Sequence, residues 1–126
     1  MTSRRTAARY APRVAARNFE ICIDANDPAV LRPFWRTALG YVDEQTAEGA
    51  ADLVDPAGVL PTVWIQKVPE VKRSKNRVHF DIRVRDQERE RLVEALVALG
   101  GTVVATYPRF TTLADPEGNE LCVTTQ

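Results

Sequence analysis

The sequence has no excess of charge of either sign, because its 17 Lys and Arg residues equal its 17 Asp and Glu residues in number. Proteins whose main partner is nucleic acid normally carry a clear basic excess. The sequence also lacks an apolar run long enough to span a membrane. These two absences predict a domain that recognises neither nucleic acid nor a lipid bilayer.

Cysteine and histidine are both scarce. Cys22 and Cys122 stand near opposite ends of the chain and form no CxxC pair, so they indicate no disulfide framework. We interpret them as reduced thiols in a cytoplasmic protein. Cys122 would need a basic neighbour to act as a nucleophile, and a small buried thiol is the simpler interpretation of both cysteines. His79 is the only histidine.

The beginning of the chain lacks acidic residues and carries several arginines. No continuous apolar run follows them, so residues 1–16 do not resemble a secretory signal and are predicted to form a flexible basic leader. Residues 17–126 are enough for one domain with its own core. The 44% of hydrophobic and 27% of charged residues are typical of a globular protein.

Residues 77–85 alternate strictly between apolar and polar side chains. Such alternation predicts a half-buried strand with one apolar face and one polar face. The apolar side holds Val78, Phe80, Ile82 and Val84, and the polar side holds His79, Asp81, Arg83 and Arg85. Residues 19–24 alternate in the same way near the start of the chain.

Further elements follow each of these strands. Asp27 and Pro28 are typical of a helix start, and the helical spacing of apolar residues after them ends at Gly40. A second helix is predicted between Asp86 and Gly100. The remaining predicted strands are 41–46, 51–54, 62–68, 102–107, 110–114 and 120–124, and residues 69–76 are predicted to be a solvated linker.

The two halves of the chain repeat one plan. Three pairs of landmarks lie about 60 residues apart: Asp27 with Asp86, Leu39-Gly40 with Leu99-Gly100, and 55–58 with 115–118. A constant offset of this size indicates a structural repeat. The prediction is therefore an α+β fold of two tandem βαβββ modules, residues 17–68 and 77–126. In this alignment Glu20 corresponds to His79.

One parity of the predicted strands is apolar and should pack under the two helices. The apolar set includes Phe19, Ile21, Ile23, Val78 and Phe80. The opposite parity is too polar for a core and has the character of a cleft lining. Its members are Glu20, Cys22, Asp24, Trp64, Gln66, His79, Asp81, Glu120 and Cys122.

Three segments carry a resemblance to a known family: Asp27-Pro28 with Phe34-Trp35 and Leu39-Gly40, then 76–81, and finally 113–122. With them the chain resembles the vicinal oxygen chelate superfamily, and within it the small glyoxalase-like and bleomycin-resistance-like proteins. The resemblance covers about residues 18–125. It implies paired βαβββ modules curled around a cleft, a divalent metal at the floor of that cleft in the enzymes, and a homodimer.

The resemblance also implies a ligand set. Glu20 and His79 correspond to the family's first-strand ligands, and both residue types bind metals. Cys122 stands where the family has a last-strand glutamate, with Glu120 two residues earlier as a substitute. On the matching strand of the first module, only Gln66 could bind a metal, through its amide oxygen. The metal site is therefore predicted to be degenerate, with Ni, Zn, Mn or Fe as its ion or with no metal at all.

Two functions follow from these expectations. The first is a binding protein whose cleft takes a small molecule between Trp64 and the polar lining, Cys22, Gln66, Asp81, Glu120 and Cys122. The alternative is a metal-dependent lyase or isomerase that acts on a small oxygen-bearing substrate, with Glu20 as base near His79. A classical glyoxalase I or a ring-cleaving dioxygenase is not expected from this ligand set. A structural interpretation of His79 is a hydrogen bond to Asp81 or Glu20.

Overall fold

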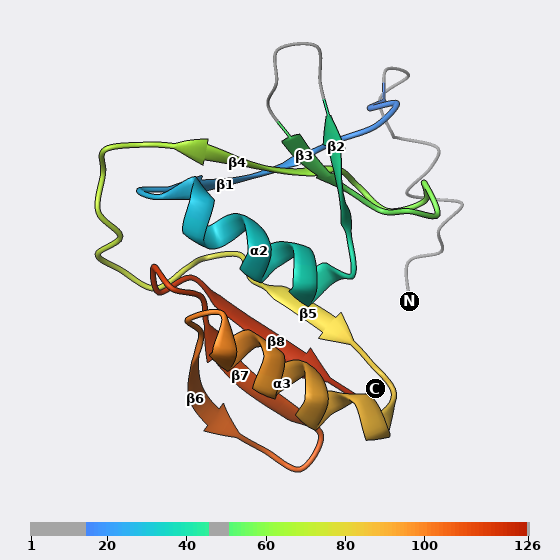
Figure 1. The fold of residues 1–126 in the computed structure, drawn as a ribbon, viewed down its shortest axis with the longest axis vertical. Helices are drawn as coiled ribbons and strands as arrows, with labels where there is room; N and C mark the ends of the chain where they lie inside the picture. Colours follow the sequence, from blue (N-terminus) through green and yellow to red (C-terminus); the bar gives the residue numbers. More distant parts are fainter. Residues whose placement is uncertain (1–14, 46–50, 126) are drawn as a thin grey trace, which may run out of the picture.

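The repeat builds two sheets of the same topology. The computed structural model describes residues 15–45 and 51–125 of the chain. One sheet has the strand order β1-β4-β3-β2 and the other β5-β8-β7-β6 (Figure 1). The first contains β1 (Ile21–Ala25), β2 (Val42–Gln45), β3 (Ala51–Val54) and β4 (Val63–Lys67), and the second contains β5 (Phe80–Arg83), β6 (Thr102–Thr106), β7 (Phe110–Ala114) and β8 (Glu120–Thr124).

In each sheet the first and last strands of a module pair in parallel, and the other neighbours are antiparallel. The predicted α+β fold of two βαβββ modules is confirmed. The two sheets remain separate and do not close into a barrel.

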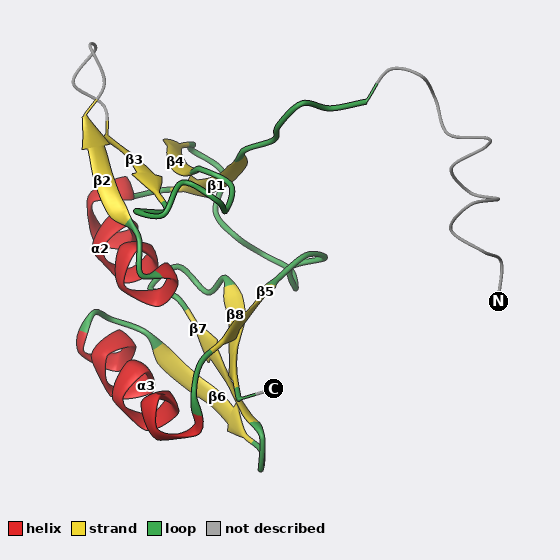
Figure 2. Ribbon diagram, turned by 90° about the vertical axis from the view of Figure 1, so that its right-hand side faces the viewer, coloured by secondary structure: helices red, strands yellow, loops and turns green. Residues whose placement is uncertain are grey.

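Two helices cover the same side of the molecule, with the sheets behind them (Figure 2). Helix α2 (Pro28–Leu39) begins after Asp27, whose side chain accepts a hydrogen bond from the Ala29 N–H, and it ends at Gly40 with φ of 67°. That left-handed conformation favours glycine, because the Cβ of any other residue would come too close to its own backbone carbonyl oxygen. Helix α3 (Arg89–Ala98) follows a short 3-10 helix, η1 (Asp86–Glu88).

A single hydrophobic core runs through both modules. Leu31, Phe34 and Trp35 of α2 are buried together with residues of both sheets and with Leu96 of α3. The Trp35 ring lies 5.0 Å from the Phe80 ring of the second module. Burying a side chain of this size contributes about 1.5–3 kcal/mol, so the shared core is the main force that holds the modules together.

The turn between β7 and β8 adds polar contacts between the modules. The buried carboxylate of Asp115 accepts a hydrogen bond of 2.9 Å from Trp35 Nε1. The Glu117 carboxylate accepts bonds from the backbone N–H groups of Asn26, at 2.6 Å, and Asp27, at 2.8 Å. Residues 115–118 of the second module therefore hold both the beginning and the middle of α2. We call this turn the brace.

Some predicted core residues are exposed instead. Phe19 is 63% exposed and Val78 84%. Val97, which helical spacing assigns to the apolar side of the second predicted helix, is 45% exposed. The first strands are shorter than predicted, because the parallel pairing starts only at Ile21 in one sheet and at Phe80 in the other. The residues before these points lie at a sheet edge with no strand beside them. Val97 faces solvent on α3, where only Leu96 of the helix is buried.

Some predictions concern residues that lie outside the described part of the chain. The predicted leader lies almost entirely outside the described residues, as does Thr46 at the end of a predicted strand. No helix among the described residues is long and apolar enough to cross a membrane.

Candidate functional site

The polar face of the second sheet lines an open hollow of about 460 Å³. Its residues come from β5, β7 and β8 and from His79 just before β5. The register places Asp81 opposite Cys122 and Arg83 opposite Thr124. The lining residues are His79, Asp81, Arg83, Phe110, Cys122 and Thr124. We call this space the second-sheet hollow.

Three side chains of types that can bind metals meet in the second-sheet hollow. The ligand atoms of His79, Asp81 and Cys122 all lie within 4.8 Å of one another. His79 Nδ1 stands 3.2 Å from Asp81 Oδ1, and Thr112 Oγ1 lies 3.3 Å from Cys122 Sγ. The predicted contact between His79 and Asp81 is thus present. Both residues are exposed, whereas Cys122 is half-buried.

This donor set fits a divalent metal in chemical terms. Two ligands of one tetrahedral zinc ion lie about 3.3–3.8 Å apart, since Zn–N and Zn–S distances are about 2.0–2.3 Å. The ligand atoms here lie within 4.8 Å of one another, so the side chains would have to move closer by up to about 1 Å to reach that spacing. Nitrogen, sulfur and carboxylate donors together suit zinc, whereas manganese and magnesium prefer a shell of oxygen ligands. His79, Asp81 and Cys122 are therefore the residues that would hold a metal.

Glu120 is engaged elsewhere. Its Oε1 accepts a bond of 2.7 Å from Lys75 Nζ, and its backbone N–H donates to Asn76 Oδ1 at 3.1 Å. The hydrogen bond from Lys75 lowers the pKa of the Glu120 carboxyl below its ordinary value. The carboxylate is therefore ionised at neutral pH and already has a cationic partner.

Cys22 and Glu120 lie in a smaller hollow of about 280 Å³ between the modules. Cys22 Sγ lies 3.7 Å from Asp24 Oδ1. Partial desolvation, followed by the negative charge of Asp24, raises the pKa of the Cys22 thiol. The thiol is therefore protonated at neutral pH, which does not favour a nucleophile. The lining residues are Ile21, Cys22, Ile23, Asp24, Trp35, Asn76, Val78, Phe80, Asn119 and Glu120.

Three other predicted site residues belong to the first sheet and line neither hollow. Glu20 is exposed just before β1, and Gln66 is exposed on β4 opposite Asp24. Trp64 is half-buried and lies opposite Cys22 in the register. Among the described contacts, none joins Glu20 or Gln66 to His79. The structure thus gathers His79, Asp81 and Cys122 but leaves Glu20, Trp64 and Gln66 apart from them.

Several residues in or beside these hollows were not predicted as site residues from the sequence. Arg83 shares the parity of His79 and Asp81, so its place in the second-sheet hollow could have been inferred from alternation alone. Phe110 and Thr124 line the second-sheet hollow because β7 pairs with β8, and no local sequence pattern specifies that pairing. Lys75 reaches Glu120 from the linker, and a run of exposed lysines and arginines gives no signal of such a contact.

Comparison with known proteins places these features in a family. A family model described as a glyoxalase-like domain matches residues 20–124. The chain therefore belongs to the glyoxalase-like domain family, and the predicted resemblance to the vicinal oxygen chelate superfamily is confirmed. The comparison with curated proteins gives no match.

Solved structures share the fold at low sequence identity. The fosfomycin resistance protein FosX from Mesorhizobium loti is similar with a TM-score of 0.72 and 12% identity, over 90% of this chain and 94% of that chain. FosX from Listeria monocytogenes, complexed with Mn(II) and sulfate, gives 0.69 and 11%, over 89% and 91%. A glyoxalase/bleomycin resistance protein from Albidiferax ferrireducens T118 gives 0.62 and 19%, over 86% and 98%.

Proposed function

We propose that this protein binds a small oxygen-bearing molecule in the second-sheet hollow. The observation that carries the proposal is the convergence of hydrogen-bonding groups there, from His79, Asp81 and Thr124, with the guanidinium of Arg83. Arg83 favours a ligand with an anionic oxygen, because its planar fork can bind two oxygens at once. Phe110 supplies an aromatic surface at the same hollow. Such a mixture is typical of small-molecule sites.

The proposal is supported by the family rather than by any single relative. The fosfomycin resistance proteins share only the fold with this chain at 11–12% identity. Fosfomycin is nevertheless a sensible first probe, since it is a compact oxygen-rich anion of the kind that Arg83 favours. Phe110 adds a reason to include small aromatic carboxylates. We propose that the protein performs this role in the cytoplasm, with both thiols reduced.

The binding test uses calorimetry or NMR titration of the purified protein with fosfomycin and with small aromatic carboxylates. Replacing Arg83 by Ala should weaken binding by about tenfold, since hydrogen bonds to charged groups contribute about 1.5–3 kcal/mol. Arg73→Ala is the matched control, because it removes the same charge from the exposed linker. Equal binding by wild type and Arg83→Ala, or equal loss in both variants, would contradict the proposed site.

A metal-dependent lyase or isomerase is the second candidate function, favoured by the cluster of His79, Asp81 and Cys122. A bound divalent metal would polarise a substrate oxygen. The residues of the hollow would position that substrate, and Asp81 would orient the His79 ring through its contact with Nδ1. In this cluster Asp81 takes the part that the sequence had suggested for Gln66 or Glu120.

Elemental analysis after exposure to zinc, manganese, nickel or iron tests the metal directly. Zinc should be retained best, and His79→Ala and Cys122→Ser should each lose it, whereas Cys22→Ser should keep it as the matched control. A protein that retains no metal, or that retains it equally in all these variants, would refute the metal site. The binding function at Arg83 would survive that result.

We also propose a homodimer. Phe19 and Val78 leave apolar surface exposed just before the first strand of each module, and the two sheets stay open at that place. A second copy of the chain would cover such surface. Sedimentation should give twice the chain mass, and Val78→Asp should shift the equilibrium to monomer. A monomeric wild type at all concentrations would refute the assembly.

A further inference from the structure

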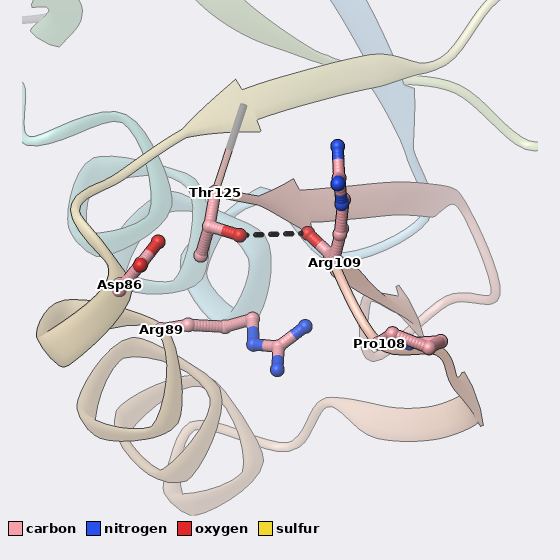
Figure 3. A pocket seen from close by; sticks show the side chains of 5 residues that line it. All are labelled: Asp86, Arg89, Pro108, Arg109 and Thr125. Carbon is pink, nitrogen blue, oxygen red and sulfur yellow. Dashed lines mark hydrogen bonds between the residues drawn. The ribbon is translucent and has the colours of Figure 1, made fainter.

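A second open hollow, also of about 460 Å³, lies beside the C-terminal ends of β5 and β8. It is formed where β5 leads into η1 and α3, where β6 turns into β7, and where β8 ends. Figure 3 shows Asp86 and Arg89 on one side, Pro108 and Arg109 on the other, and Thr125 between them. This hollow shares no residue with the second-sheet hollow. We call it the arginine hollow.

The backbone at the arginine hollow is held by several hydrogen bonds. The Arg109 carbonyl accepts bonds from the Thr125 N–H, at 3.0 Å, and from Thr125 Oγ1, at 3.1 Å (Figure 3). Tyr107 and Phe110 close the turn around Pro108, with their rings stacked at 4.5 Å. The turn therefore presents Arg109 from a fixed position, and little ordering of the backbone is needed for a ligand to bind.

The second arginine is tied to the same turn. Arg89 Nη1 donates to the Tyr107 carbonyl at 3.1 Å, so the beginning of α3 and the turn are linked. This bond uses one of the guanidinium's five donors.

The arginine hollow has no acidic group paired with its two cations. None of the described ion pairs contains Arg89, Arg109 or Asp86, although all three line the hollow. Two cations and one anion leave a net positive charge around the space. A guanidinium without a carboxylate partner is suited to a carboxylate or phosphate from outside, which it binds in a bidentate manner.

We propose that the arginine hollow is a binding site for a small organic anion that carries a carboxylate or a phosphate group. The anion is held by the guanidinium groups of Arg89 and Arg109. Asp86 repels it, which keeps the affinity below what two arginines alone would give. The two sites share no lining residue, but Phe110 and Thr124 of the second-sheet hollow adjoin Arg109 and Thr125. Arg83→Ala separates them, because it should weaken binding at the second-sheet hollow and leave anion binding at the arginine hollow unchanged.

The test is an NMR titration with inorganic phosphate and, separately, with succinate, at constant ionic strength. Saturating shifts should appear at the amides of Asp86, Arg109 and Thr125. Arg109→Gln should weaken binding about tenfold, as expected for loss of a charge-assisted bidentate pair. Asp86→Asn should strengthen it about threefold, because a repulsive charge that lines the same hollow is removed. Whichever of phosphate and succinate binds more tightly shows whether the site prefers a phosphate or a carboxylate group.

Arg91→Gln is the matched control. It removes the same charge from the same helix, but Arg91 is exposed and lies 3.8 Å from Glu88, outside the arginine hollow. Arg91→Gln should change the affinity less than twofold, and the spectra of all variants should keep the native dispersion. Equal losses in Arg91→Gln and Arg109→Gln, or no saturating shift with either anion, would overturn the proposal. Weaker binding by Asp86→Asn would also overturn it, since that result requires a ligand with a cationic group.

Discussion

Replacing Asp115 by Asn is expected to destabilise the protein far more than the same change at the equivalent position of the first module. Asp115 is only 3% exposed. One of its oxygens accepts from Trp35 Nε1 and Asn119 Nδ2, and the other from the backbone N–H groups of Glu117 and Asn119. Whichever way an amide is turned, its NH2 group faces two donors.

The size of the loss follows from the unpaired groups. A buried donor without an acceptor costs about 1–3 kcal/mol, and bonds to a neutral oxygen are weaker than bonds to a carboxylate. The free energy of unfolding should fall by about 3 kcal/mol, and the melting temperature by roughly 10 °C for a domain of this size. Urea unfolding followed by circular dichroism and tryptophan fluorescence measures the change.

Asp55→Asn is the matched control, because Asp55 occupies the corresponding turn of the first module. Its carboxylate accepts from the backbone N–H groups of Ala57, Val59 and Leu60, but these bonds lie at the surface. Water can replace them there, so the loss should be much smaller. A double-mutant cycle with Trp35→Phe should show coupling only for Asp115. Equal losses at the two aspartates would refute the reasoning.

Three further predictions follow from particular contacts. Glu117→Ala should lower the free energy of unfolding by about 1 kcal/mol, as loss of a helix cap does, in urea titrations. Backbone hydrogen bonds from Leu60 and Ala57 lower the pKa of Asp55 below its ordinary value of 3.8. The ionised Asp55 therefore stabilises the folded state above about pH 3.8, and this stabilisation is lost as the pH falls through the lowered pKa. Asp55→Asn should flatten the pH dependence of the free energy of unfolding in the acid range. In a Cys122→Ser background, Asp24→Asn should speed alkylation of Cys22 near pH 8, because the charge of Asp24 raises the pKa of that thiol.

The architecture could be predicted because its signals are local and occur twice. Asp27, Pro28 and Gly40 mark the first helix by their own backbone preferences. The second helix begins later than predicted, at Arg89, because Asp86 opens a short 3-10 helix and no side chain caps either segment. Alternation on 77–85 assigned Ile82 to the apolar side and Arg83 to the polar side. It could not say where the strand begins, because that depends on where β8 starts to pair, at Leu121 opposite Phe80. Val78 was therefore assigned to the core although it is exposed.

The candidate site was predictable only in part. Parity placed His79 and Asp81 together, and the aligned turns placed Cys122 near them. The proposed pairing of Glu20 with His79 came from the family resemblance, which makes them equivalent first-strand positions of the two modules but does not bring them into contact within this chain. Long-range contacts such as that of Lys75 with Glu120 depend on how the linker runs past the second sheet. No pattern of residues in the sequence predicts the course of the linker.

The brace also bears on the order in which the chain folds during synthesis. Helix α2 belongs to the first half, yet its indole partner lies 80 residues later, at Asp115, and the carboxylate at its N-terminus lies about as far away, at Glu117. A nascent first module that has left the ribosome alone still lacks both contacts, and Trp35 has no second sheet to pack against. We therefore expect the two modules to fold together, with the turn between β7 and β8 supplying the last contacts of the first helix.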